Sequence, residues 1–204
     1  MAAADHRVLI PRGNGTISGM TTRPERLHFT DDDEADRLLA ESPLALLIGF
    51  VLDQQVPLQK AFVGPLELGR RIGGLDAGQI ATLDPEKLDA AFRERPALHR
   101  FPGAMASKVQ QVCSIVAERY GGRAERIWTE ARDADDLRAR LEALPGFGKM
   151  KVESLAAVLA NRFGVETARG LVPDHPTLGD VDSPEARAEY QSWKRSMKAA
   201  QRRG

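Results

Sequence analysis

The segment Leu141 to Gly164, LEALPGFGKMKVESLAAVLANRFG, interrupts two helical patterns with the turn Pro145-Gly146-Phe147-Gly148. Leucines at helical spacing precede the turn, and a second apolar stripe follows it at once. Glycine has no Cβ and adopts positive φ readily, so Gly146 and Gly148 can open the backbone amides at the start of the second helix to a close ligand. The natural ligand of such amides is an anion. The alternative is a plain helical hairpin, in which the glycines only make a turn.

A second chemical signal lies at the end of an apolar helix. The sequence LALLIGFVLDQQV begins after Ser42-Pro43 and is apolar on every side until Asp53-Gln54-Gln55. A helix with this pattern is expected in the centre of a domain. Its polar end therefore places two amide side chains where the helix leaves the core.

Composition limits the fold and the partners. The 204 residues include 29 basic and 29 acidic side chains, so no overall positive field favours nucleic acid. Ala, Leu, Arg and Glu dominate and β-branched runs are scarce, which predicts an all-α fold. The single cysteine, Cys113, lies in an apolar helical stripe and is expected to be a buried hydrophobic residue. One cysteine excludes a disulfide framework and a four-cysteine iron-sulfur cluster held by this chain.

The chain is expected to form one helical domain over residues 20–204, with the hairpin at 134–163 and a C-terminal helix at 183–202. Residues 1–19 are Gly-rich and aperiodic, which indicates disorder or a start assigned too early, with Met20 as the first residue. Thr30 is expected to cap the first helix. No apolar run reaches the length of a membrane span, and the N-terminus lacks a signal-peptide core. A cytoplasmic protein without a membrane partner is therefore expected.

Taken together, the two signals resemble a known family. The run Leu144-Pro145-Gly146-Phe147-Gly148 followed by a helix resembles the helix-hairpin-helix motif of the base-excision DNA glycosylases, typified by endonuclease III and 3-methyladenine DNA glycosylase II. The stretch LIGFVLDQQVP at 47–57 is similar to the family's buried helix, which ends in Gly-Gln-Gln-Val-Ser in close relatives. The resemblance covers roughly residues 30–170 and implies the glycosylase-like helical bundle.

The resemblance also implies a DNA-binding set. The hairpin amides, including those of Lys149 to Lys151, hold a DNA phosphate, and both lysines add charge. Nearby carbonyls hold a monovalent cation, Na⁺ or K⁺, with no side-chain metal ligands. Gln55 matches the wedge glutamine that faces the orphaned base after its partner is flipped out. Capping of the helix end by Gln54 and Gln55 is the alternative. The implied DNA-binding residues are Gln54, Gln55, Pro145, Gly146, Phe147, Gly148, Lys149, Met150 and Lys151.

The implied chemistry is base removal without strand cleavage. Met150 occupies the position of the family's lyase lysine, and Lys149 and Lys151 point about 100° to either side of it on the helix. The catalytic aspartate is expected in the loop after the hairpin, where Asp174 comes first and Asp180 second.

Other residues of the same region have weaker assignments. Asp182 is a third choice for the catalytic aspartate, or a cap for the last helix. His175 is an expected surface residue that can otherwise orient a water. Arg93, Arg95, His99 and Arg100 form a basic loop, which is either a phosphate contact or a solvated face. Tyr190 and Trp193 are expected to pack the last helix onto the domain.

The predicted function is therefore that of a monofunctional DNA glycosylase. Its expected partner is double-stranded DNA containing a damaged base, and the protein is expected to be a nucleoid-associated monomer without cofactors. One alternative is a helix-hairpin-helix relative that binds DNA lesions without chemistry, and absence of a placed aspartate favours it. Another alternative is a helical protein-interaction module, which lack of salt-dependent DNA binding favours.

Overall fold

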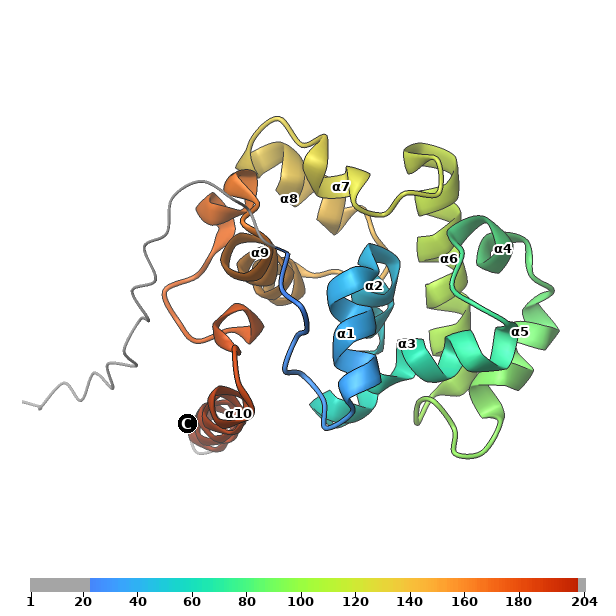
Figure 1. Ribbon diagram of the computed structural model, residues 1–204, viewed down its shortest axis with the longest axis horizontal. Helices are drawn as coiled ribbons and strands as arrows, with labels where there is room; N and C mark the ends of the chain where they lie inside the picture. Colours follow the sequence, from blue (N-terminus) through green and yellow to red (C-terminus); the bar gives the residue numbers. More distant parts are fainter. Residues whose placement is uncertain (1–22, 202–204) are drawn as a thin grey trace, which may run out of the picture.

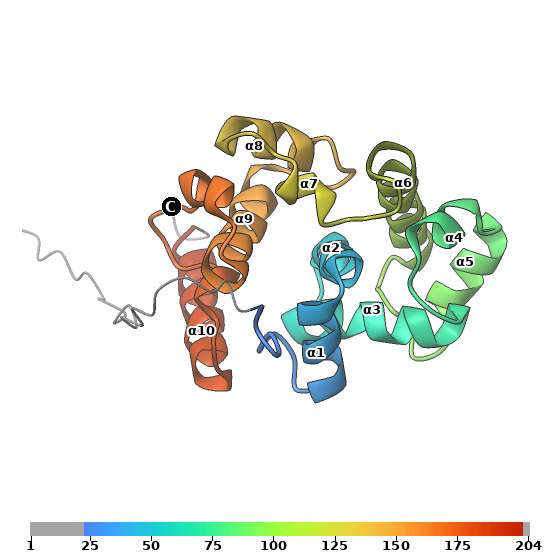
Figure 2. The same ribbon diagram turned by 45° about the horizontal axis from the view of Figure 1, so that its top comes forward.

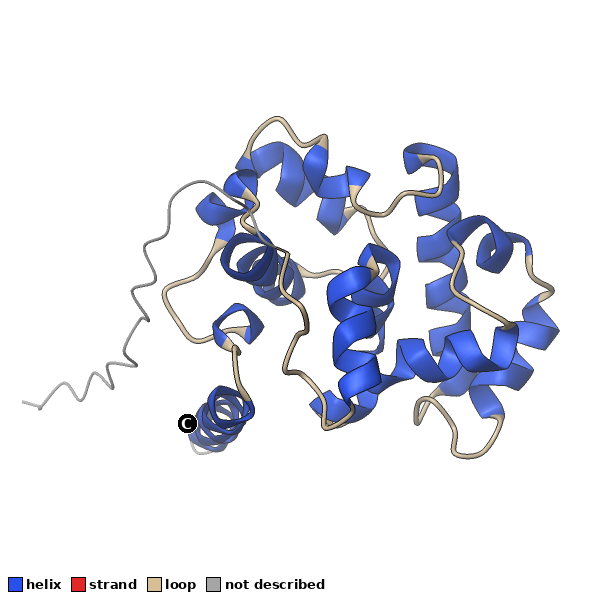
Figure 3. Ribbon diagram, in the orientation of Figure 1, coloured by secondary structure: helices blue, strands red, loops and turns tan. Residues whose placement is uncertain are grey.

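A computed structural model describes residues 23–201 of the chain, and this part is built from helices without strands (Figures 1 and 3). The all-α expectation is confirmed for these residues. The expectations for residues 1–19 and for position 202 concern residues outside the described part. The elements, in order, are α1 Asp33–Glu41, α2 Pro43–Leu52, α3 Leu58–Ile72, α4 Ala77–Thr82, α5 Pro85–Arg93, α6 Pro102–Tyr120, α7 Arg126–Thr129, α8 Ala134–Glu142, α9 Lys149–Phe163, the 3-10 helices η1 Glu166–Leu171 and η2 Leu178–Asp180, and α10 Pro184–Gln201.

Helix α2 is the central element (Figure 1). The Ser42 hydroxyl accepts a hydrogen bond from the Ala45 amide at 3.1 Å, and Pro43 occupies the first turn, so the helix begins where the sequence predicts. Every residue from Leu44 to Leu52 is buried. Helices α1, α3 and α6 pack against α2. Gly49 is required there, because a Cβ at this position would lie 2.6 Å from the Phe62 ring of α3.

The cap of α1 differs from the expected one. The Asp32 carboxylate accepts the amides of Glu34 and Ala35, so Asp32 and not Thr30 is the N-cap. Thr30 instead contributes to a buried network, in which its hydroxyl and amide both donate to Asp36 Oδ1 at 2.9 Å. Burial raises the pKa of Asp36 to about 6, although the Phe29 and Thr30 donors oppose this shift.

The second half of the chain surrounds α9. Helix α9 contacts α8, η1 and η2, and the two 3-10 helices occupy the segment that lacks periodicity in the sequence. The contact with η2 is tight, because a Cβ on Gly179 would lie 2.4 Å from the backbone oxygen of Ala157. Gly164 ends α9 with φ of 66°, as the sequence predicts.

Helix α10 lies beside the N-terminal segment and on the same side of the molecule as α9 (Figure 2). The buried Arg187 donates to the Thr30 carbonyl and to the Asp31 carboxylate. Gln191 Nε2 donates to Gln59 Oε1 at 3.0 Å, which ties the helix to the start of α3. Tyr190 is buried and stacks on Trp193 with ring centroids 6.2 Å apart, so these aromatics pack the helix as expected.

The Asp36 network predicts an unusual pH dependence. The carboxyl has a pKa of about 6 in the folded protein and an unperturbed value of 3.8. Its contribution to stability is therefore full below pH 3.8 and is lost as the pH rises through 6. In Asp36→Asn the amide oxygen can still accept the same bonds, but the site no longer ionises. We expect the unfolding free energy of the parent, relative to this variant, to fall by about 1–3 kcal/mol between pH 4 and pH 7.5.

Urea unfolding of both proteins at a series of pH values measures this difference. The remaining titrating groups are common to the two chains and cancel. A difference that is constant with pH, or one that grows as the pH rises, would contradict the assignment.

Candidate nucleic-acid interface

The hairpin turn meets the end of α2 although the two segments are far apart in sequence. Gly146 has φ of 85°, and a Cβ there would lie 3.4 Å from Gln54 Nε2 and 3.7 Å from Lys108 Cδ of α6. Both the backbone conformation and the close approach require glycine. The structure thus brings together the two sequence segments that carry the predicted site.

Gly148 behaves differently from the prediction. It is the N-cap of α9 with φ of −86°, so the expected positive φ is wrong at this position. No side chain caps the helix, and an added Cβ would meet nothing within 4 Å. The space beside the Gly148 Cα is therefore open.

The amides at this helix start are partly available. The Lys151 amide donates to the Gly148 carbonyl at 2.9 Å, so within the protein this amide already has an acceptor. Within residues 23–201, the amides of Gly148, Lys149 and Met150 have no hydrogen-bond acceptor. Three adjacent amide donors at the positive end of a fifteen-residue helix are able to bind an anion.

The side-chain amide of Gln54 is held by hydrogen bonds within the protein. Its Nε2 donates to the Val51 carbonyl at 2.7 Å, and its Oε1 accepts from Lys108 Nζ at 3.1 Å. Its backbone carbonyl accepts from His99 Nε2 at 2.8 Å. Capping of the helix end, the alternative to DNA contact, is therefore the observed role of this side chain.

Gln55 is the free glutamine. Its side chain is exposed and makes no hydrogen bond to the described residues. Its φ of 56° makes it the only residue other than glycine with positive φ in this part of the chain. The left-handed conformation costs about 1–2 kcal/mol for a residue with a Cβ. Such strain occurs at functional positions that the surrounding structure holds in place.

His99, which the sequence placed in a basic loop, is a structural residue. It is only 1% exposed. The Phe101 amide donates to Nδ1 at 3.0 Å, so the ring proton is on Nε2 and bonds to Gln54. Burial lowers the pKa of His99, which keeps the ring neutral near pH 7. This residue fixes the loop before α6 to the end of α2.

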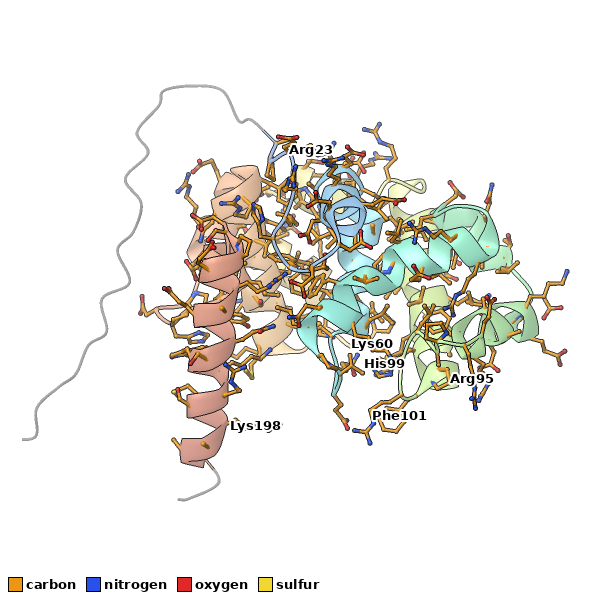
Figure 4. The ribbon with its side chains drawn as sticks, turned by 60° about the horizontal axis from the view of Figure 1, so that its bottom comes forward. Arg23, Lys60, Arg95, His99, Phe101 and Lys198 are labelled. Carbon is orange, nitrogen blue, oxygen red and sulfur yellow. The ribbon has the colours of Figure 1, made fainter. Side chains whose placement is uncertain are left out.

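The same loop presents an aromatic ring that the sequence reading missed. Phe101 is 44% exposed, with the Arg100 guanidinium 4.7 Å from its ring centroid. Figure 4 shows Phe101 projecting outward on the side of the molecule that also carries Lys60 and Arg95. The signal available in the sequence was a phenylalanine in a loop, directly before Pro102. Of the other basic residues of this loop, Arg93 pairs with Asp89.

The three residues of the first turn of α9 have different surroundings. Lys149 is exposed and lies 3.8 Å from Glu153, and Met150 is 78% exposed. Lys151 turns inward, whereas the sequence suggested that it adds charge to the hairpin together with Lys149. Its ammonium nitrogen is buried without a hydrogen-bond partner and lies 5.5 Å from the Phe147 ring centroid.

Burial lowers the pKa of Lys151 to about 8. The nearby Asp53 carboxylate opposes this shift and Lys108 adds to it. Asp53 is half-buried, ends α2 and also acts on the phenol of Tyr190. Sequence reasoning missed this carboxylate as a site residue because it belongs to the glutamine stretch and not to the loop after the hairpin.

The predicted catalytic aspartates lie in the segment between η1 and α10. Asp174 is exposed and makes no hydrogen bond within the described residues. Asp180 Oδ2 accepts the Thr177 amide at 2.8 Å and the Thr177 hydroxyl at 3.0 Å, so this carboxylate is engaged in a capping box. A third contact, from Asn161 of α9, is 3.5 Å long.

The neighbouring residues have structural partners as well. Ser183, and not Asp182, caps α10, because its hydroxyl accepts the Ala186 amide at 3.1 Å. His175 stacks on Trp193 with ring centroids 5.5 Å apart. Cys113 is buried, and burial raises the pKa of its thiol to about 12, in accord with a packing role.

Among residues 23–201, no three His, Cys, Asp or Glu side chains gather as a metal site. In the same span, no helix combines the length and apolar character needed to cross a bilayer.

Comparison with protein-family models, with curated proteins and with solved structures gives no match.

The left-handed backbone at Gln55 gives a direct prediction. Gly tolerates this conformation and Ala does not, while both remove the same side chain. We expect Gln55→Gly to be more stable than Gln55→Ala by about 1 kcal/mol in urea unfolding. Equal stabilities, or a more stable alanine variant, would contradict the conformation assigned to this residue.

Proposed function

We propose that this protein is a base-excision DNA repair protein of the helix-hairpin-helix type. It binds duplex DNA, extrudes a damaged base and hydrolyses its glycosidic bond. The observation that carries the proposal is the meeting of two features at one edge. Gly146, two residues before the first unpaired amide of the α9 start, lies against the side chain of Gln54, and the next residue, Gln55, is exposed with a left-handed backbone.

The amides support contact with the DNA backbone. Amides at a helix start bind phosphate independently of base sequence, which suits a protein with no net charge. The exposed Lys149 adds positive charge at the same turn. The exposed Lys60 and Arg95, on the side of the molecule that carries Phe101, and the exposed Arg100 offer further phosphate contacts (Figure 4).

Two side chains suit the duplex interior. Extrusion of a nucleotide leaves a hole in the stack, and filling that hole offsets part of the cost of unpairing. The free amide of Gln55 can donate to and accept from the orphaned base. The exposed ring of Phe101 can stack on a neighbouring base, and Arg100 is already placed over its face. The link from His99 to Gln54 holds the two side chains in a fixed relation.

A monovalent cation suits the hairpin carbonyls. In the described part of the chain, the carbonyls of Pro145, Gly146 and Phe147 accept no hydrogen bond, whereas those of Leu144 and Gly148 do. The three free oxygens would hold Na⁺ or K⁺. The cation would supply positive charge beside the bound phosphate.

Base removal needs a carboxylate to stabilise the positive charge that develops on the sugar. Asp174 makes no hydrogen bond within the described residues. Asp180 would have to break its hydrogen bonds to Thr177, and Asp53 lies near Lys151 of α9. A lesion-binding protein without chemistry is the second candidate function. The engagement of Asp180 and the exposed position of Asp174 favour it.

A substitution at Gly148 can change DNA binding without disrupting the fold, because an added side chain there meets open space. In Gly148→Asp, the new carboxylate can cap α9 and should stabilise the fold by about 0.5–1 kcal/mol. The same carboxylate occupies the amides and repels phosphate, so we expect at least about tenfold weaker duplex binding, or 1.4 kcal/mol. Gly148→Ala fills the space without capping and should bind as the parent does.

Fluorescence anisotropy with a labelled duplex, at several salt concentrations, measures these affinities. A Gly148→Asp variant that is more stable and binds DNA as tightly as the parent would exclude the helix start as the phosphate site.

The reaction is tested by single-turnover incubation with duplexes that carry uracil, 3-methyladenine, hypoxanthine or 8-oxoguanine. We expect base release from one of them, seen as alkali-labile sites. We also expect a loss of at least about 10²-fold in the Asp→Asn variant of the essential carboxylate. Asp174→Asn, Asp180→Asn and Asp53→Asn are compared. Tight binding without base release from any duplex would establish the lesion-binding function instead.

A further inference from the structure

Helix α10 packs on the protein through its first half only. Arg187 and Tyr190 are buried, and Trp193 stacks on His175 with ring centroids 5.5 Å apart. From residue 194 to residue 200 every side chain is exposed, while the chain stays helical. About two turns of helix therefore extend beyond the last packing contact. We call residues 194–200 the projecting half of α10.

The projecting half carries positive charge and no negative charge. Lys194, Arg195 and Lys198 are exposed, and none of them pairs with a carboxylate in the described part of the chain. No aspartate or glutamate follows Glu189 in the sequence. The helix dipole favours a cation in the last turn, but its effect falls off within that turn. It therefore accounts for Lys198 and leaves the other two cations unexplained.

The projecting half lies on the side of the molecule that carries part of the proposed interface. Figure 4 shows Lys198 near the free end of α10, on the same side as Phe101. Just before the projecting half, Gln191 Nε2 donates to Gln59 Oε1 at 3.0 Å. Gln59 belongs to the start of α3, in the segment that follows Gln55. This hydrogen bond ties α10 to the segment that carries the exposed glutamine.

The residue types of the projecting half select the partner. A helix that binds a membrane surface needs a broad apolar face. Among residues 194–200, Met197 is the only large apolar side chain, so such a face is absent from this part of the helix. Exposed cations without carboxylate partners suit the regularly spaced phosphates of a nucleic-acid backbone. Contacts of this kind position a duplex and carry no base sequence.

We propose that the projecting half of α10 is a second arm of the DNA-binding surface, which contacts phosphates other than those bound at the hairpin. This inference rests on the proposed function, because its partner is the duplex held by the amides at the start of α9. A single phosphate site leaves a duplex free to turn about it. A second contact, remote from the first, sets the direction in which the duplex crosses the protein.

Removal of the three charges tests the arm. The arm variant combines Lys194→Gln, Arg195→Gln and Lys198→Gln in the full chain, and its duplex affinity is measured by fluorescence anisotropy over a salt series. We expect at least about tenfold weaker binding near 0.1 M salt. We also expect the slope of log K against log salt to become smaller in magnitude by about 2–3, as the loss of three phosphate contacts requires.

A matched control removes the same amount of charge from other helices. It combines Arg37→Gln of α1, Lys87→Gln of α5 and Arg119→Gln of α6, which are all exposed and have no carboxylate partner in the described part of the chain. Charges remote from the duplex are screened by salt, so we expect this control to bind within about threefold of the parent. Lys194→Arg combined with Lys198→Arg keeps the charges and should bind as the parent does.

Hydrogen exchange gives a readout that overall charge does not move. A helical segment without packing opens easily, so the amides of the projecting half should exchange rapidly in the free protein and become protected in the duplex complex. Bound duplex without this protection overturns the inference. Unchanged binding by the arm variant, or an equal loss in the arm variant and the control, also overturns it. In these cases weaker binding by Gly148→Asp leaves the proposed function standing. Absence of duplex binding by the parent at low salt removes both.

Discussion

Burial of α2 on all sides is the constraint on which the rest of the structure depends. An all-apolar helix must be covered around its whole circumference, so other helices gather around it and its polar end becomes a junction. Its last carbonyls need donors, and the amide of Gln54 supplies one of them. His99 then anchors the following loop to the Gln54 carbonyl, and the hairpin glycine packs against the same side chain. The geometry of the proposed interface thus follows from how this helix ends.

Electrostatics in this molecule acts locally. Basic and acidic residues balance over the chain, and many of the exposed arginines are paired with carboxylates. The positive groups that concern the proposed interface are the unbonded amides at the start of α9 and the exposed guanidinium of Arg100, which has no carboxylate partner among the described residues. Lys151 is the opposite case, a cation withdrawn from water beside one carboxylate and another lysine. A protein with this arrangement can attract a phosphate to one edge without a general affinity for polyanions.

Local patterns in the sequence predicted the parts of the structure that depend on neighbours in the chain. The central helix with its Ser42 cap, the helices on both sides of the hairpin and the positive φ of Gly146 all follow from spacing and residue type. The N-cap of α1 was predicted at Thr30 and is Asp32, because the Thr30 hydroxyl donates a hydrogen bond to the buried carboxyl of Asp36 instead.

The site residues that sequence reasoning missed depend on tertiary contacts. The burial of His99, the inward turn of Lys151 and the role of Asp53 arise where α2, α6 and α9 meet. No local pattern encodes that meeting. The two hairpin glycines look alike in sequence, yet only Gly146 has a positive φ and makes the turn. Gly148 has the extended conformation of a helix N-cap.

The proposed function requires the hairpin amides and Gln55 to contact duplex DNA together. Titration of the ¹⁵N-labelled protein with a short duplex containing an abasic site, followed by amide chemical shifts, measures this contact. We expect the largest shifts at Gly148, Lys149, Met150 and Gln55, with smaller ones at Arg100 and Phe101 and none along α4. Shifts confined to other surfaces, or no shifts at low salt, would contradict it.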